Sequence, residues 1–128
     1  MIPTFVTYLD TVTPSFTTVE NARLLQPEDS KPENLPALFA FRDMGEGGPS
    51  RCGHKVSQKA TRIVSVYLVC SHLDHEALEL ELFNAVLGWQ FTPEWQGMEY
   101  QDDKVVSIAG NIIWHQYNFS TWHTIRQT

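Results

Sequence analysis

Cysteine and histidine side chains are the first candidates for chemistry in this 128-residue sequence. Cys52 and His54 form one close pair, and Cys70, His72 and His75 follow in a Cys-x-His-x-x-His pattern. Their thiol and imidazole groups could together form a tetrahedral zinc site. The spacing is loose, so structural thiols and surface imidazoles are the simpler interpretation. We therefore expect no metal ligands, and a small Cys/His metal-binding protein is kept as an alternative.

A nucleophilic active site would pair one of the cysteines with a histidine. Cys70 lies in an apolar stretch typical of a strand, where a thiol usually packs and is inert. The carboxylates fall on a solvated helix face or beside a predicted turn: Glu76, Glu79, Glu81, Glu99, Asp102 and Asp103. No phosphate loop, dinucleotide fingerprint or metalloprotease motif is present. We expect no catalytic residue and no cofactor, with a small enzyme as the alternative.

The charge distribution favours contact with other proteins. The chain has 9 basic and 15 acidic residues and a net charge of −6, which disfavours a dedicated nucleic-acid binder. Residues 51–62 nevertheless contain no acid and four bases, Arg51, Lys55, Lys59 and Arg62. These bases could keep an edge strand solvated. Alternatively, they could dock onto an acidic surface of another protein, or make passing contact with DNA phosphates. We take these four as candidate interface residues.

Length and composition limit the class of protein. A chain of this length fits one domain, spanning 1–128, and 42% hydrophobic with 19% charged residues is ordinary globular composition. No apolar run approaches the roughly 18 residues needed to span a bilayer, and the first residues lack a signal peptide's pattern. We therefore expect neither a membrane protein nor a secreted one, and we expect both cysteines to be free thiols.

The apolar patterning predicts an α+β fold. Helical spacing predicts a helix over 2–12 and another from Asp74 to Gly88, with an apolar stripe of Leu78, Leu82, Ala85 and Val86. Strands are predicted at 35–41, 59–71, 98–101, 104–108 and 112–125, with a turn at Asp102-Asp103. Residues 44–58 are predicted to be a long flexible arm between two strands. The result is a mostly antiparallel sheet of about four to five strands with two main helices.

Aromatic residues are concentrated in the last third of the chain, which contains all four tryptophans. So many large rings are hard to bury in a small domain, and some could be interface anchors. For Trp89 and Trp114 we expect a place in the core.

The order of these features resembles the tail terminator proteins of long-tailed bacteriophages. The resemblance covers most of the chain. It rests on these segments: Leu35-Pro36-Ala37-Leu38-Phe39, the loop leading to Gln58, Val64 to Val69, Leu87-Gly88-Trp89-Gln90, Met98-Glu99-Tyr100, Gly110, and Ile113-Trp114-His115-Gln116-Tyr117-Asn118-Phe119. Residues 26–34 have no counterpart in this pattern.

The resemblance implies a structural virion protein without enzymatic activity. Its copies, six in number, would form a ring on the last ring of tail-tube protein, stop polymerisation of the tube and join the tail to a neck or head-completion protein. Double-stranded DNA would pass through the bore without specific binding, and assembly would take place in the host cytoplasm. A head–tail stopper or a tail completion protein is the nearest alternative.

Overall fold

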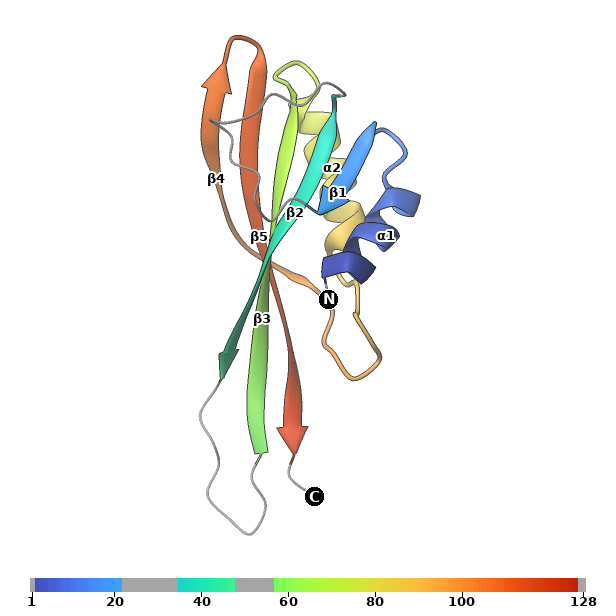
Figure 1. The fold of residues 1–128 in the computed structure, drawn as a ribbon, viewed down its shortest axis with the longest axis vertical. Coiled ribbons are helices and arrows are strands. Elements are labelled where there is room, and N and C mark those ends of the chain that lie inside the picture. Colours follow the sequence, from blue (N-terminus) through green and yellow to red (C-terminus); the bar gives the residue numbers. More distant parts are fainter. Residues whose placement is uncertain (1, 22–34, 48–56, 127–128) are drawn as a thin grey trace.

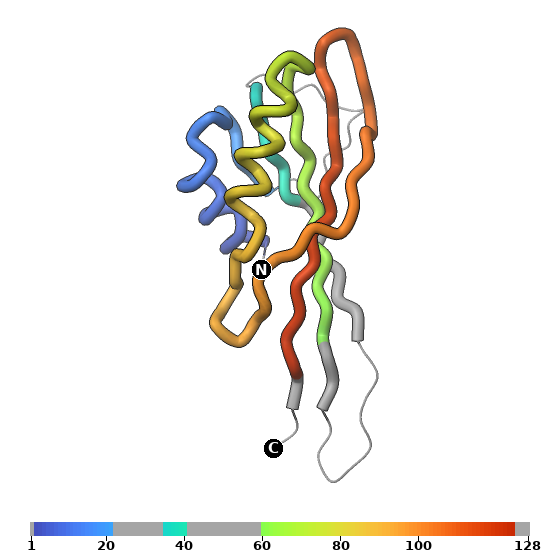
Figure 2. The backbone as a smooth tube through the Cα atoms, turned by 180° about the vertical axis from the view of Figure 1, so that it is seen from behind, coloured from blue at the N-terminus to red at the C-terminus, as the bar shows by residue number. Residues whose placement is uncertain are grey.

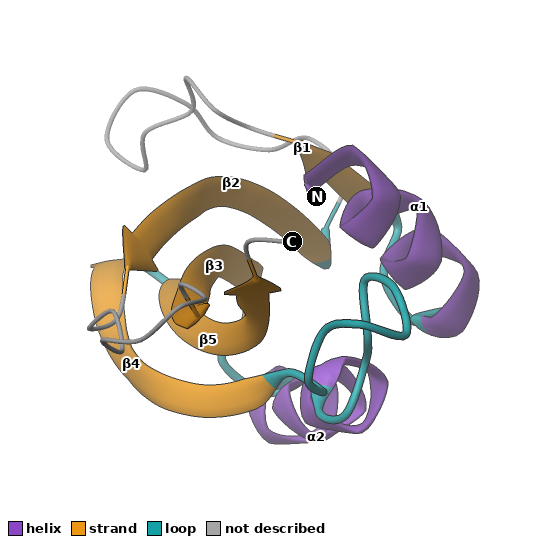
Figure 3. Cartoon of the chain, turned by 90° about the horizontal axis from the view of Figure 1, so that it is seen from below, coloured by secondary structure: helices purple, strands orange, loops and turns teal. Residues whose placement is uncertain are grey.

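Two helices lie on one side of a curved five-stranded sheet (Figures 1 and 3). The computed structural model describes residues 2–21, 35–47 and 57–126. In chain order the elements are α1 (Ile2–Val12), β1 (Thr18–Asn21), β2 (Ala37–Gly47), β3 (Ser57–Ser71), α2 (His75–Val86), β4 (Glu99–Ala109) and β5 (Ile112–Arg126). The strand order is β1-β2-β3-β5-β4, and only β1 and β2 pair in parallel. The predicted α+β class with a mostly antiparallel sheet is confirmed.

The main core lies between the helices and the facing side of the sheet. Phe5 and Leu9 of α1 and Leu82 of α2 are fully buried there, against Val66 and Phe119 of the central strands. Burial of each such side chain contributes roughly 1.5–3 kcal/mol, so the helices are held mainly by this face. A smaller apolar cluster lies on the opposite face of the sheet and contains Ala37, Phe39, Tyr67, Val69 and Trp114.

The predicted stripe on α2 is buried along its whole length: Leu78, Leu82, Ala85 and Val86. Asp74 occupies the N-cap position, although its carboxylate makes no capping hydrogen bond. The helix is followed by Gly88, whose positive φ of 85° suits glycine. Among the described residues, no helix has the length and apolar character needed to cross a bilayer.

A close backbone approach sets where β4 begins. Gly88 donates a hydrogen bond to the Met98 carbonyl (2.9 Å), and Met98 donates one to the Trp89 carbonyl (2.8 Å). A Cβ on Gly97 would lie 2.9 Å from the Cα of Gly88, so only glycine fits without a backbone shift. This contact fixes the entry into β4 beside the end of α2.

The predicted arm at 44–58 is shorter than expected. Its first residues continue β2 as far as Gly47, and its last residues belong to β3, which begins at Ser57. Glycines weaken local strand propensity, but the ladder with β3 pairs Gly45 with Arg62 and Gly47 with Ala60. Backbone pairing therefore overrides the local composition. The rest of the predicted arm lies outside the described residues.

The predicted turn at Asp102-Asp103 is wrong, because β4 runs unbroken through both residues. The pairing of β4 with β5 is irregular at two places. The register shifts between Tyr100 and Asp102, and again between Val105 and Ser107. Aspartate favours turns by bonding its own backbone. Here the two carboxylates instead accept hydrogen bonds from side chains of β5, Asn118 and His115.

The strands β2, β3 and β5 continue beyond the start of β4 and past the helices (Figures 1 and 2). Glu99, the first residue of β4, pairs with Ser120. Beyond that point 121–126 of β5 pair with 57–62 of β3, and 45–47 of β2 pair with 60–62. We call these three segments the β-ribbon.

We expect Trp114→Ala to destabilise the protein by about 3–5 kcal/mol, the cost typical of truncating a large buried aromatic. Trp114 is 4% exposed, and its ring contacts those of Phe39 (centroids 6.0 Å apart) and Tyr67 (5.5 Å). Urea melts measure the free energy of unfolding. Leu73→Ala is the control, because Leu73 is 84% exposed and should cost almost nothing. Equal stability of the two variants would contradict the core role.

Candidate functional site

The basic residues predicted for docking are only partly within the described structure. Arg51 and Lys55 lie outside the described residues. Lys59 and Arg62 both belong to the β-ribbon, where Lys59 is opposite Thr124 and Arg62 is opposite Thr121. The Arg62 side chain is exposed. The strand register therefore places two of the four predicted bases, Lys59 and Arg62, in the β-ribbon.

The outward side of α2 has the opposite charge. From Asp74 to Val86 the sequence contains four acidic residues and no lysine or arginine. Glu76 is exposed, as predicted. The prediction of a wholly solvated acidic face is wrong for the other two glutamates of the helix. Glu81 accepts hydrogen bonds from the Ser15 hydroxyl (2.8 Å) and backbone N–H (3.3 Å), and Glu79 accepts one from Tyr117.

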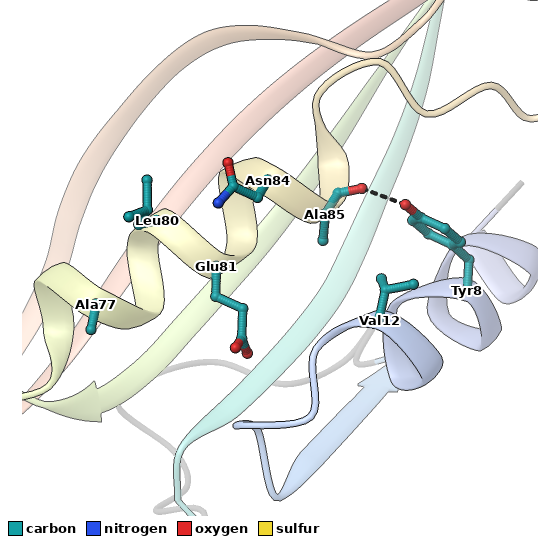
Figure 4. A pocket seen from close by; sticks show the side chains of 7 residues that line it. All are labelled: Tyr8, Val12, Ala77, Leu80, Glu81, Asn84 and Ala85. Atoms are coloured by element: carbon teal, nitrogen blue, oxygen red, sulfur yellow. Dashed lines mark hydrogen bonds between the residues drawn. The ribbon is translucent and has the colours of Figure 1, made fainter.

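Exposed apolar side chains accompany these carboxylates. Leu80 is 61% exposed and Leu73 is 84% exposed. A hollow of about 440 Å³ lies between α1 and α2, and Figure 4 shows the side chains that line it: Tyr8, Val12, Ala77, Leu80, Glu81, Asn84 and Ala85. The Tyr8 hydroxyl closes one end by donating to the Ala85 carbonyl (2.7 Å). Exposed apolar surface rimmed by charge is typical of a protein contact. We call Leu73, Glu76, Ala77 and Leu80 the α2 face.

A second group of functional side chains lies between α2 and the sheet. His75 and Glu79 stand one helical turn apart on α2, while His115 and Tyr117 alternate on the helix-facing side of β5. Asp103 reaches the group from β4. Helical and strand periodicities thus bring five polar side chains from three elements to one place. We call these five residues the polar cluster.

Short distances join the members of the polar cluster. His75 Nε2 lies 2.9 Å from His115 Nδ1, and the Tyr117 hydroxyl lies 3.3 Å from the first nitrogen and 3.2 Å from the second. The same hydroxyl donates a hydrogen bond to Glu79. On its far side His115 Nε2 lies 2.7 Å from Asp103 Oδ1. His115 and Tyr117 are buried, and the other three are partly exposed.

The hydrogen bonds restrict where the protons can lie. Asp103 as a carboxylate can only accept, so His115 carries a proton on Nε2, and in its neutral form Nδ1 presents a lone pair. His75 then donates from Nε2 to that lone pair. Burial, followed by the nearby His115, lowers the pKa of His75, which favours the neutral imidazole. With this tautomer of His115, each imidazole donates one hydrogen bond, which His115 Nδ1 and Asp103 Oδ1 accept.

The two tyrosines of this region remain protonated. Burial and the hydrogen bond to Glu79 raise the pKa of Tyr117 far above its usual range. A hydrogen bond to Asp103 raises the pKa of Tyr100 to about 12. The same hydrogen bond from Tyr100, with that from His115, lowers the pKa of Asp103. Asp103 is thus held as an anion by donors on both sides.

The cysteine and histidine set that the sequence offered only as an alternative zinc site does not come together in the described residues. Cys52 and His54 lie outside them, Cys70 is buried in the main core, and His72 is exposed. Only His75 belongs to the polar cluster. Its true partners, Glu79, His115, Tyr117 and Asp103, went unrecognised. Their signal in the sequence was the His75–Glu79 helical spacing and the His115–Tyr117 alternation, which gain meaning only once α2 is known to cover β5.

No family model matches this sequence, and a search of curated proteins also finds no match. The function therefore has to be inferred from the geometry of the chain itself.

We expect the Cys70 thiol to react very slowly in the native protein. Burial, reinforced by Asp74, raises the pKa of Cys70 to about 11, so its thiolate fraction near pH 8 falls roughly 100-fold relative to an ordinary thiol. The measurement is alkylation of a Cys52→Ser variant with and without urea, since Cys70 is then the remaining cysteine. Similar rates in both conditions would show that Cys70 is accessible.

Acid should remove the stabilisation that Asp103 contributes. Because its pKa is lower in the folded state than in the unfolded chain, this contribution is present above pH 4 and is lost as the pH falls through the folded-state pKa. We expect Asp103→Asn to lower the urea midpoint of unfolding at pH 6. The difference in midpoint between the variant and wild type should narrow by pH 2.5. Asp10→Asn, on the exposed side of α1, is the control. A gap that does not change with pH would contradict the assignment.

Proposed function

We propose that this chain is the subunit of a homo-oligomeric ring, most simply a hexamer, that caps the head-proximal end of a phage tail tube as a tail terminator. One observation carries the proposal: a single chain has two unlike surfaces, the basic end of the β-ribbon and the acidic, partly apolar α2 face. A contact between unlike surfaces is head-to-tail, and it closes into a ring when the rotation between copies allows. The α+β class agrees with what the family resemblance implies.

Charge complementarity supports this contact. Lys59, Arg62 and Arg126 belong to the β-ribbon by sequence and register, and Arg51 and Lys55 lie in the sequence between β2 and β3. The α2 face carries Glu76 beside the exposed Leu73 and Leu80. Opposite charges steer the approach of two copies, and the apolar side chains supply area to bury. If the β-ribbon of each copy docks on the α2 face of the next copy, the same contact repeats around the ring.

The remaining roles follow from a ring without an active site. One side of the ring would meet the tail-tube protein and stop its polymerisation, and the other would meet a neck or head-completion protein. The net charge of −6 supports passage of double-stranded DNA through the bore without specific binding, because like charges repel. The protein would then be part of the virion tail and neck after assembly in the host cytoplasm.

Replacing Arg51, Lys55, Lys59 and Arg62 together by serine should leave the fold intact and abolish or strongly weaken ring assembly. Removing four charges from one side of an electrostatic contact slows association and weakens it, above all at low salt. Light scattering measures the mass of the assembly, and circular dichroism checks the fold. A control variant removes other bases, Arg23, Lys31 and Lys104, and should assemble normally. Assembly of the first variant at both low and high salt would disprove the docking role.

The terminator role itself is tested with the tail-tube protein of the same phage. Light scattering gives the mass of the protein alone and in the mixture, and electron microscopy of the mixture shows tube ends. We expect six-fold rings that cap the tubes and limit their length. A ring that ignores tubes would instead favour a head–tail stopper or tail completion protein, and a permanent monomer would contradict the proposal.

A further inference from the structure

We propose that His75, Glu79 and His115 bind one divalent transition-metal ion, for which Zn²⁺ is the best match to the donor set. One ligand atom from each of the three residues lies within 4.8 Å of the other two. Two imidazoles and one carboxylate are a common protein donor set for zinc, with the fourth position left to water. The proposal concerns a site inside one subunit and does not depend on ring assembly.

The distances between donor atoms are close to those that a bound ion needs. Bonds of about 2.0–2.1 Å in a tetrahedral arrangement place neighbouring ligand atoms about 3.3 Å apart. His75 Nε2 is 2.9 Å from His115 Nδ1 and 4.0 Å from Glu79 Oε2, so the two distances fall on either side of that value. Because His75 and Glu79 are partly exposed, small rotations of their side chains are enough to admit an ion.

The Asp103 carboxylate is hydrogen-bonded to the proposed ligand His115, as is usual for histidine ligands in metal centres. His115 presents Nδ1 to the site while its Nε2 faces Asp103 Oδ1 at 2.7 Å. Such a partner fixes the tautomer and the orientation of a ligating imidazole and strengthens it as a donor. Asp103 is in turn held by Tyr100. The ring of His115 is therefore already oriented for metal binding by a partly buried hydrogen bond.

The charge of the polar cluster also favours a cation. The polar cluster contains two acidic side chains, Glu79 and Asp103, and no lysine or arginine, so acidic groups are in excess there. In the portion of the chain that the structure describes, neither carboxylate has an ion pair with lysine or arginine. A divalent cation would neutralise this excess where it is partly shielded from water. A hollow of about 270 Å³ beside Glu79, Tyr100 and Asp103 offers a path to solvent.

Besides small side-chain rotations, metal binding requires a rearrangement of protons. His115 Nδ1 already has a lone pair, which in the arrangement described above accepts the hydrogen bond from His75 Nε2. The proton of His75 would move from Nε2 to Nδ1, which changes the tautomer and leaves the ring neutral. Tyr117 keeps its proton and its hydrogen bond to Glu79. The ion would then connect α2 directly to β5.

The experiment uses untagged full-length protein treated with a chelator and then freed of it. Calorimetric titration with Zn²⁺ should show one ion per chain, and Co²⁺ should give the visible absorption of a four- or five-coordinate site. We expect His75→Gln and Glu79→Gln each to weaken Zn²⁺ binding at least tenfold. Asp103→Asn should weaken it about 10–100-fold, the range typical of residues behind a ligand.

Matched controls come from the same region of the chain. His72→Gln and Glu76→Gln alter an exposed imidazole and an exposed carboxylate next to the site and should leave the affinity unchanged. Cys52→Ser should also bind normally, which separates this site from a Cys/His site. Zn²⁺ should raise the melting temperature of wild type and leave that of Glu79→Gln unaltered.

Three results would overturn the proposal. One is folded wild-type protein that does not bind Zn²⁺. Another is unchanged affinity in both His75→Gln and Glu79→Gln, with circular dichroism showing that both are folded. The third is loss of binding in Cys52→Ser. Each of these measurements reports the ions bound per chain at a site inside one subunit, so failure of the tail terminator role would leave them unaffected.

Discussion

The antiparallel ladder between β3 and β5 is the constraint on which the rest of this molecule depends. Both strands have 15 residues, and they pair from Ser57 with Arg126 to Ser71 with Ile112 without a register shift. The side chains of β5 alternate, so Tyr117 and Phe119 face the helices while Trp114 packs on the opposite face. A slip of one residue would exchange the two faces and remove both apolar clusters.

The same ladder connects the proposed metal site with the proposed subunit contact. Its central part holds His115 and Tyr117 beneath α2, and its far end forms the β-ribbon with Lys59 and Arg62. Three sides of α2 have different surroundings. Leu82 lies in the core, Glu79 belongs to the polar cluster, and Leu80 is exposed. An ion in the polar cluster would hold α2 against the sheet. It would thereby stiffen the face that a neighbouring subunit is proposed to contact.

Strong local patterns predicted their elements well. The helix expected over 2–12 and the apolar stripe of α2 are both confirmed, because helical periodicity reports directly on a buried face. The assignment of Cys70 and Trp114 to the interior is also confirmed. Weak local patterns gave wrong predictions. Asp102-Asp103 was predicted to be a turn, but both residues pair with β5. Gly45 and Gly47 were predicted to belong to an arm, but both pair with β3.

The sequence by itself determined the fold class, the helix positions and the concentration of basic residues at 51–62, since all of these depend on residue type and short-range spacing. Only the tertiary structure decided that His75 and Glu79 of α2 meet His115 of β5 and Asp103 of β4. Residues separated by as many as 40 positions become neighbours through strand order and register. The physical reason is that local periodicity specifies which face a side chain occupies, whereas the packing of one element on another specifies what that face meets.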